Sequence, residues 1–207
     1  WLASPDICYW KGSNCDKNGI ATLDLSFNRQ IDKELPVDLV TRLPHLRKLR
    51  IEGGNNNQQP LPANFGDWRN LSFLTLRGNN IKDTLPSTVF ADKERLWYLE
   101  LAGNQFFGGI PEEWAEMANL TYLDITGNDV SGPIPDRFYK LPLKTFFFDV
   151  DKVCVPTQQI KEWLDAIPSV NDRNYLFCNQ APSFFEMIAP DGDTIDLRAI
   201  FSTLWRG

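Results

Sequence analysis

The middle of the chain alternates apolar and polar residues in a pattern that returns in the same register. Three successive segments show it most clearly: "LSFLTLRGNNIKDTLP" from Leu71, "LWYLELAGNQFFGGIP" from Leu96 and "LTYLDITGNDVSGPIP" from Leu120. Each has leucine or isoleucine at its first, fourth and sixth positions, then a Gly-Asn pair and a closing proline. The alternation predicts a short strand with one buried face, and the glycine and proline residues predict the turns that follow it.

Looser copies flank these three segments. "IATLDLSFN" begins at Ile20, "LRKLRIEGG" at Leu46 and "LKTFFFDVD" at Leu143. The residue at the fourth position recurs about every 24 residues, a spacing typical of stacked repeats: Leu23, Leu49, Leu74, Leu99, Leu123 and Phe146. A single repeat cannot close a core, so we expect about six strands to stack into a curved solenoid with a parallel sheet on its concave face.

An asparagine follows the strand in four repeats: Asn28, Asn79, Asn104 and Asn128. Its side-chain amide both donates and accepts hydrogen bonds, so it can satisfy backbone groups inside the turn. We therefore predict a buried polar ladder beside the leucine core.

The four cysteines form one pair near each end of the repeats, Cys8 with Cys15 and Cys154 with Cys178. A structural zinc site needs four convergent ligands, and the single histidine, His45, lies far from both pairs in sequence. We predict two disulfides, which imply an oxidising compartment. The segment "CVPTQQIKEWLDAIPSV" predicts a capping helix with one apolar face, formed by Ile160, Trp163, Leu164 and Ile167.

Over roughly residues 1 to 150 the chain resembles plant-type leucine-rich-repeat ectodomains. The repeat ending N-x-φ-x-G-x-[IL]-P, in which φ is apolar, is the signature of that type, and its N-terminal cap has the form W…C-x-W-x-G-x-x-C. These residues fit the cap: Trp1, Cys8, Trp10, Gly12 and Cys15. Ser13 replaces the usual valine. The resemblance implies a right-handed α/β solenoid with disulfide-bonded caps, a second short strand per repeat, and cap helices before Trp1.

We divide the chain into an N-terminal cap at 1–19, repeats at 20–150, a C-terminal cap at 151–179 and a tail at 180–207. The tail carries apolar residues that need burial on the solenoid, on a partner or at a membrane interface. Its candidate docking residues are Phe184, Phe185, Ile200, Phe201, Leu204 and Trp205. The last four of these, with Leu197, follow the spacing of one helical stripe.

The composition limits the possible partners and cellular location of the protein. The 207 residues are 43% hydrophobic, enough for a core, and carry a formal net charge of −6. This charge disfavours nucleic acid and anionic membranes as partners, and no apolar run approaches the roughly 20 residues that span a bilayer. The sequons "NLS" at Asn70 and "NLT" at Asn119 are candidate glycosylation sites. We expect a secreted, extracellular protein or one in the lumen of an oxidising organelle.

The sequence carries no catalytic signature that we recognise. His45 lies in "RLPHLRKL", a predicted turn, without the surroundings of a nucleophile–histidine pair. Phosphate loops, H-E-x-x-H and G-x-S-x-G motifs are absent from the sequence, and "APDGDTID" lacks the terminal glutamate of a calcium loop. We therefore predict a protein that is not an enzyme and that uses no cofactor or metal.

The outward positions of the strands are the candidate functional surface. The third position carries Phe73, Tyr98 and Tyr122 in successive repeats, and adjacent strands lie about 4.8 Å apart, so we predict a contiguous aromatic strip. We expect acidic residues beside the strip and basic residues toward its N-terminal half. The candidate partner-binding residues are Lys48, Arg50, Phe73, Arg77, Tyr98, Glu100, Tyr122, Asp124 and Phe147.

Three hypotheses of function follow. The first is a protein-binding module that recognises a polypeptide on its concave face, because aromatic residues flanked by charge give interfaces affinity and register. The second is a structural subunit of a larger membrane-associated assembly, docked through its tail. The third is a carbohydrate-binding or enzyme-inhibitor protein. The resemblance implies receptor-like ectodomains and polygalacturonase-inhibitor-like proteins, both of which are non-catalytic.

Overall fold

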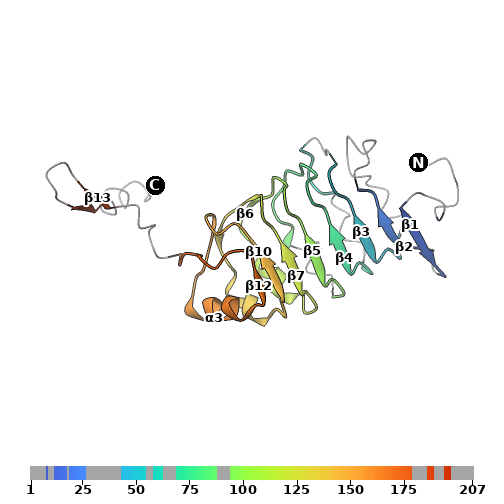
Figure 1. Ribbon diagram of the computed structural model, residues 1–207. Helices are drawn as coiled ribbons and strands as arrows, with labels where there is room; N and C mark the ends of the chain where they lie inside the picture. The colour runs from blue at the N-terminus through green and yellow to red at the C-terminus, as the bar shows by residue number, and fades with distance from the viewer. Residues whose placement is uncertain are drawn as a thin grey trace.

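The repeats form one sheet. The computed structural model describes residues 8, 12–17, 19–26, 43–54, 58–62, 69–87, 94–178, 186–188 and 194–196. Within them, an eight-stranded sheet runs in the order β1-β2-β3-β4-β5-β7-β10-β12, and the strands lie side by side along the solenoid (Figure 1). Its strands are β1 Ser13–Asp16, β2 Gly19–Asp24, β3 Lys48–Arg50, β4 Phe73–Thr75, β5 Tyr98–Glu100, β7 Tyr122–Asp124, β10 Thr145–Phe147 and β12 Ser169–Val170. The predicted solenoid with a parallel sheet is confirmed, since every pair except the antiparallel β1–β2 is parallel.

The predicted leucine positions form the core. Leu49, Leu74, Leu99 and Leu123 lie directly opposite one another on successive strands, and each is buried. The first and sixth positions are buried as well, among them Leu71, Leu76, Leu96, Leu101, Leu120 and Ile125. Burying a leucine side chain stabilises a fold by about 1.5 to 3 kcal/mol, so this repeated set dominates the free energy of folding.

The asparagine ladder is also present. Asn104 donates from Nδ2 to the carbonyl oxygens of Leu76 and Leu101, each at 2.8 Å, and its Oδ1 accepts from the backbone N–H groups of Asn79 and Ile81 at 3.0 and 3.1 Å. Asn79 and Asn128 make equivalent bonds to the strand before them. Asn28 lies outside the described residues. Each turn is thereby fastened to the previous repeat.

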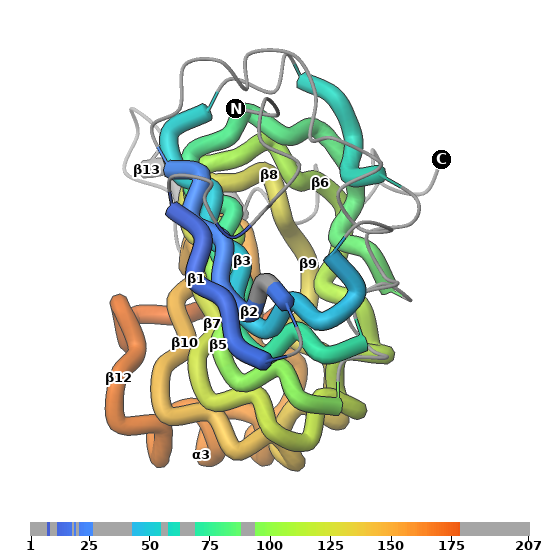
Figure 2. Tube along the Cα trace, turned by 90° about the vertical axis from the view of Figure 1, so that its right-hand side faces the viewer, coloured from blue at the N-terminus to red at the C-terminus, as the bar shows by residue number. Residues whose placement is uncertain are grey.

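Short strands and 3₁₀ helices build the rest of each coil. β6 Phe107–Gly108 pairs with β8 Asp129–Val130, and β9 Gly132–Pro133 pairs with β11 Val153–Cys154. Figure 2 shows β6, β8 and β9 across the coil from the main sheet. The helices η3 Glu112–Glu116 and η4 Asp136–Lys140 follow, and they bury Trp114 and Phe138. The second short strand that the resemblance implied is confirmed for these later repeats.

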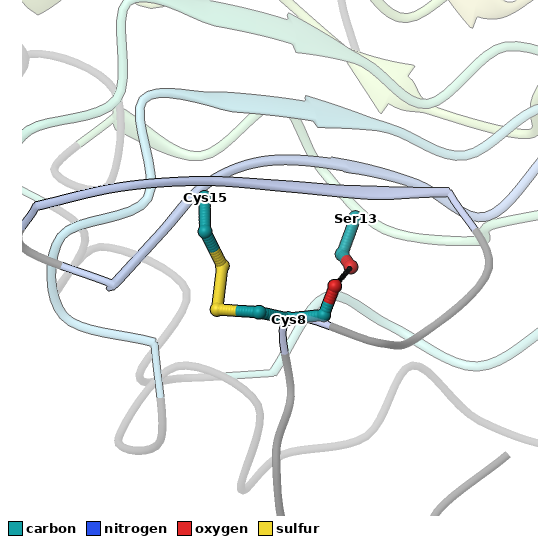
Figure 3. The surroundings of a disulfide bond; sticks show 3 residues. All are labelled: Cys8, Ser13 and Cys15. Carbon is teal, nitrogen blue, oxygen red and sulfur yellow. Dashed lines mark hydrogen bonds between the residues drawn. A yellow bond between two sulfur atoms is a disulfide. The ribbon is translucent and has the colours of Figure 1, made fainter.

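The first predicted disulfide joins Cys8 to Cys15, and Ser13 Oγ donates to the carbonyl oxygen of Cys8 at 3.2 Å (Figure 3). Gly12 has a φ of +90°, and its carbonyl oxygen accepts from the Asp24 amide at 2.9 Å. A Cβ at this position would lie 2.1 Å from the Asp24 carbonyl oxygen, so glycine is required there. Trp1 and Trp10, the other cap residues, lie outside the described residues.

The C-terminal cap contains the predicted helix, α3 Gln158–Ala166. Thr157 caps its start by accepting from the Ile160 amide at 3.3 Å, and Ile160, Leu164 and Ile167 are buried against the last repeat. Cys154 and Cys178 form the second predicted disulfide.

The cap also continues the sheet, which the sequence did not predict. β12 pairs with β10 immediately after the helix. Asn171 then bonds both backbone groups of Phe148, through Oδ1 at 3.1 Å and Nδ2 at 2.8 Å, as a further strand would. The cap is therefore a partial seventh coil rather than a helix alone.

Candidate functional site

Three predicted aromatic residues meet on the concave face. Phe73, Tyr98 and Tyr122 are directly opposite one another on β4, β5 and β7. Their rings stack in parallel, with centroids 4.2 Å apart at 10° for the first pair and 4.1 Å apart at 9° for the second. The contiguous strip is confirmed, and we refer to these three residues as the aromatic column.

Other side chains contact both ends of the aromatic column. Lys48 Nζ lies 4.4 Å from the ring centroid of Phe73, a cation–π distance. Phe147, on β10, meets Tyr122 at 6.1 Å and 72°. The faces of the stacked rings are therefore largely covered by one another, and the column presents ring edges to a ligand.

Trp97 joins this surface and was not among the predicted residues. It immediately precedes β5, it is 45% exposed, and its ring lies edge-on to Phe73 at 5.9 Å and to Tyr98 at 5.6 Å. The signal was a tryptophan at the second position of a repeat, where no leucine of the core belongs. Trp97 is thus a large apolar side chain held in place beside the column and open to solvent.

Two acidic residues of the concave face, Glu100 and Asp124, are buried. Glu100 is only 6% exposed, because its carboxylate accepts hydrogen bonds from Thr75 Oγ1 and the Tyr98 hydroxyl, both at 3.0 Å. Arg77 lies above it at 3.2 Å. Glu100 therefore lies beside the column, as expected, but its carboxylate is bonded to neighbouring side chains rather than free for a ligand.

Asp124 is buried to a similar extent, at 5% exposed. Its Oδ1 accepts from the backbone N–H of Thr126 at 3.0 Å and from the Thr126 hydroxyl at 2.7 Å. Burial raises the pKa of Asp124, and the nearby charge of Glu100 raises it further, while the Thr126 bonds oppose the shift. Burial likewise raises the pKa values of the Tyr98 and Tyr122 hydroxyls, which therefore stay protonated at neutral pH.

Two of the basic residues on the concave face are paired with carboxylates of the chain. Arg50 Nε lies 2.8 Å from Glu52 Oε1 and 3.9 Å from Asp24 Oδ2, and these carboxylates raise the pKa of the arginine, Glu52 most of all. Arg77 pairs with Glu100. The basic residues lie toward the N-terminal half of the face and Glu100 and Asp124 lie beside the column, as expected, but the charges of Arg50 and Arg77 are engaged in ion pairs within the chain.

Comparison with known proteins identifies the repeat. The family described as Leucine Rich Repeat matches residues 119–141. Receptor-like protein 6 of Arabidopsis thaliana is 36% identical over 78 residues, which are 37% of this chain and 8% of that protein. The domain is a leucine-rich-repeat solenoid, and its repeats are similar to those of plant receptor-like proteins.

Solved structures agree on the fold. Pollen Receptor Kinase 3 superposes on the domain with a TM-score of 0.69 at 21% identity, over 90% of this chain and 88% of that one. The ectodomain of the Arabidopsis receptor kinase HAESA, solved with a peptide hormone ligand, gives 0.62 at 25% identity over 84% of this chain and 29% of that one. The matches span 8% and 9% of the lengths of the curated receptor-like proteins, so they show a similar repeat and nothing about the partners of a whole protein.

Both sequons occupy the same place in the leucine-rich repeat. Asn70 and Asn119 each precede the first leucine of a repeat, and each donates to a carbonyl of the previous repeat, Asn70 to Pro44 and Asn119 to Glu94. Asn119 is exposed and Asn70 is partly exposed. Glycosylation at both remains a prediction.

The predicted docking residues of the tail lie outside the described residues: Phe184, Phe185, Ile200, Phe201, Leu204 and Trp205. The described part of the tail is a hairpin in which β13 Glu186–Ile188 pairs antiparallel with β14 Thr194–Asp196. Docking through the tail stays a prediction. Across the part of the chain that the structure describes, no helix is long and apolar enough to cross a membrane.

Proposed function

We propose that this domain is an extracellular protein-binding module that recognises a polypeptide with the aromatic column and Trp97. The observation that carries the proposal is the half-exposed tryptophan fixed at the edge of a stacked aromatic column. Two disulfides and the receptor-like relatives support an oxidising, extracellular setting.

The geometry favours tight contact at low entropic cost. Tryptophan and tyrosine are the residues that most often dominate binding energy at protein interfaces. Here their rings are ordered before binding, because Tyr98 is stacked on both sides and its hydroxyl is bonded to Glu100. A partner would therefore meet a rigid surface, which avoids much of the ordering cost of association.

The same geometry disfavours carbohydrate as the ligand of the column. Sugars contact aromatic residues by lying on ring faces. In the column most of those faces are covered by neighbouring rings and, at Phe73, by Lys48; only part of a face stays open where Tyr122 meets Phe147. Ring edges, which carry the positive part of the ring quadrupole, suit the carbonyl oxygens of a polypeptide better.

The test compares two aromatic residues that are equally exposed. Trp97 and Phe107 are both 45% exposed, but Phe107 belongs to β6, across the coil from the main sheet. Peptides selected from a random displayed library against the wild-type domain serve as the probe. We expect Trp97→Ala to weaken binding of a selected peptide by about 2 kcal/mol, or roughly 30-fold, and Phe107→Ala to leave it unchanged.

Thermal melting of both variants verifies that the fold is retained. Equal losses for the two variants, or a loss confined to Phe107→Ala, would place recognition elsewhere on the domain. Failure of the wild-type domain to select any peptide would remove the proposal.

A further inference from the structure

The C-terminal end of the aromatic column forms a corner. Tyr122 and Phe147 meet at 72° instead of stacking, and rings that meet steeply leave part of a face uncovered. Asp124 belongs to this corner. It lies two residues after Tyr122 on β7, hence on the same face of the sheet, and it is the register partner of Phe147 on β10.

Asp124 differs from the other carboxylates of the concave face. Asp24 and Glu52 flank Arg50, Glu100 pairs with Arg77, and Asp149 accepts from the Gly127 amide at 3.0 Å. Asp124 uses only Oδ1, toward Thr126. Its Oδ2 has no hydrogen-bond or ion-pair partner within the part of the chain that the structure describes, and this oxygen still reaches solvent although the residue as a whole is only 5% exposed.

The carboxylate of a mostly buried residue is poorly solvated, and its accessible Oδ2 is open to a cation that arrives with the ligand. The flanking rings suit the same ligand group, because an ammonium or guanidinium is attracted to aromatic faces as well as to a carboxylate. A metal ion fits less well, since hard cations require several oxygen ligands, and no group of three candidate ligands occurs among the described residues.

We propose that the corner of Tyr122, Phe147 and Asp124 binds a lysine or arginine side chain of the polypeptide partner, with Asp124 as its counter-ion. This inference rests on the proposed function and adds the chemistry of the partner to it. The partner then combines an apolar segment at Trp97 with a cationic residue one or two strands away toward the C-terminal cap.

The test uses the selected peptides. Those retained by the wild-type domain should be enriched in lysine or arginine at one position relative to the starting library. For one such peptide, replacing that residue by glutamine should weaken binding about tenfold. Asp124→Asn should weaken binding of the original peptide by the same factor and leave the glutamine peptide unaffected, so that the double-mutant cycle shows coupling.

Asp136→Asn is the matched control. It removes one negative charge from an exposed residue of η4, outside the concave sheet, and should leave both affinities unchanged. Amide spectra of each variant show whether the fold is intact.

The outcomes separate the two proposals. Binding that depends on Trp97 but shows neither cationic enrichment nor coupling to Asp124 would overturn the cation site and leave the proposed function standing. If Asp136→Asn weakens binding as much as Asp124→Asn does, the loss of binding comes from the long-range charge of the domain, and this result too would overturn the cation site. Absence of any selected peptide removes both proposals.

Discussion

The two faces of the same strands differ in what they repeat. On the inner face, Leu74, Leu99 and Leu123 occupy one position in register, and all are buried. On the concave face the position one residue later holds Asp24, Arg50, Thr75, Glu100, Asp124 and Phe147 in turn. The backbone is the same on both faces, so the repeated residues specify the solenoid and the varying residues specify what it contacts.

The concave face is nevertheless more than an exposed surface. Thr75, Glu100 and Asp124 are all buried there. They lie on the same side of the sheet as the aromatic column, and Glu100 is bonded directly to Tyr98. The varying residues therefore form a second, thin packed layer. Each of them affects the free energy of unfolding differently.

The largest loss of stability should come from the residues that repeat, here the asparagine ladder in the turns after the strands. Asn104→Ala removes the acceptor of two buried amides and the donor to two buried carbonyl groups. Each buried polar group left without a partner costs about 1 to 3 kcal/mol, so we expect a loss of about 4 kcal/mol in the free energy of unfolding, measured by chemical denaturation. Asn174→Ala, at an exposed asparagine of the C-terminal cap, should change stability by less than about 0.5 kcal/mol. Similar small losses for both would contradict the ladder.

An intermediate effect should come from the aromatic column. Tyr98→Ala removes a ring stacked on both sides and the hydroxyl that donates to Glu100, and we expect a loss of about 2 kcal/mol. Tyr98→Phe keeps the stack and should cost about 1 kcal/mol. If the concave face were ordinary surface, denaturation would show both variants within about 0.5 kcal/mol of the wild type.

The smallest predicted change is a gain in the free energy of unfolding, at Asp124. Because burial raises the pKa of Asp124 above its value in the unfolded chain, the folded chain binds that proton more tightly, and the charged carboxylate costs stability at neutral pH. Glu100 adds to this shift, whereas Arg77 and Thr126 oppose it. Asp124→Asn should therefore raise the free energy of unfolding at pH 7.

That gain should shrink as the pH falls through the raised pKa, where the wild-type carboxyl becomes neutral as well. Denaturation curves of both proteins between pH 7 and pH 3 measure the difference. A gain that does not change with pH would mean that the charge of Asp124 is not its cause.

The structural features that recur from repeat to repeat could be predicted from the sequence. Leu99 and Asn104 could be assigned because equivalent residues occur one repeat before and after, and the aromatic column followed from a shared third position. β12 could not be predicted, because Ser169–Val170 is too short to show a pattern and its continuation depends on the side chain of Asn171.

Burial on the concave face could not be predicted either. Glu100 is buried through donors that come from two strands, Thr75 on β4 and Tyr98 on β5, and Arg50 is paired with Asp24 from the previous repeat. Such contacts depend on how far each side chain reaches across the sheet. Position in the repeat indicates the direction of a side chain but not its partners.

The most direct test of the central claim is a footprint of the bound partner on the domain. Hydroxyl radicals oxidise exposed aromatic residues, and mass spectrometry reads the extent of oxidation at each residue with and without a selected peptide. Trp97 and Phe107 start from the same 45% exposure. We predict that the peptide reduces oxidation of Trp97 several-fold and leaves Phe107 unchanged. Protection of Phe107 with Trp97 still fully oxidised would contradict recognition by the concave face.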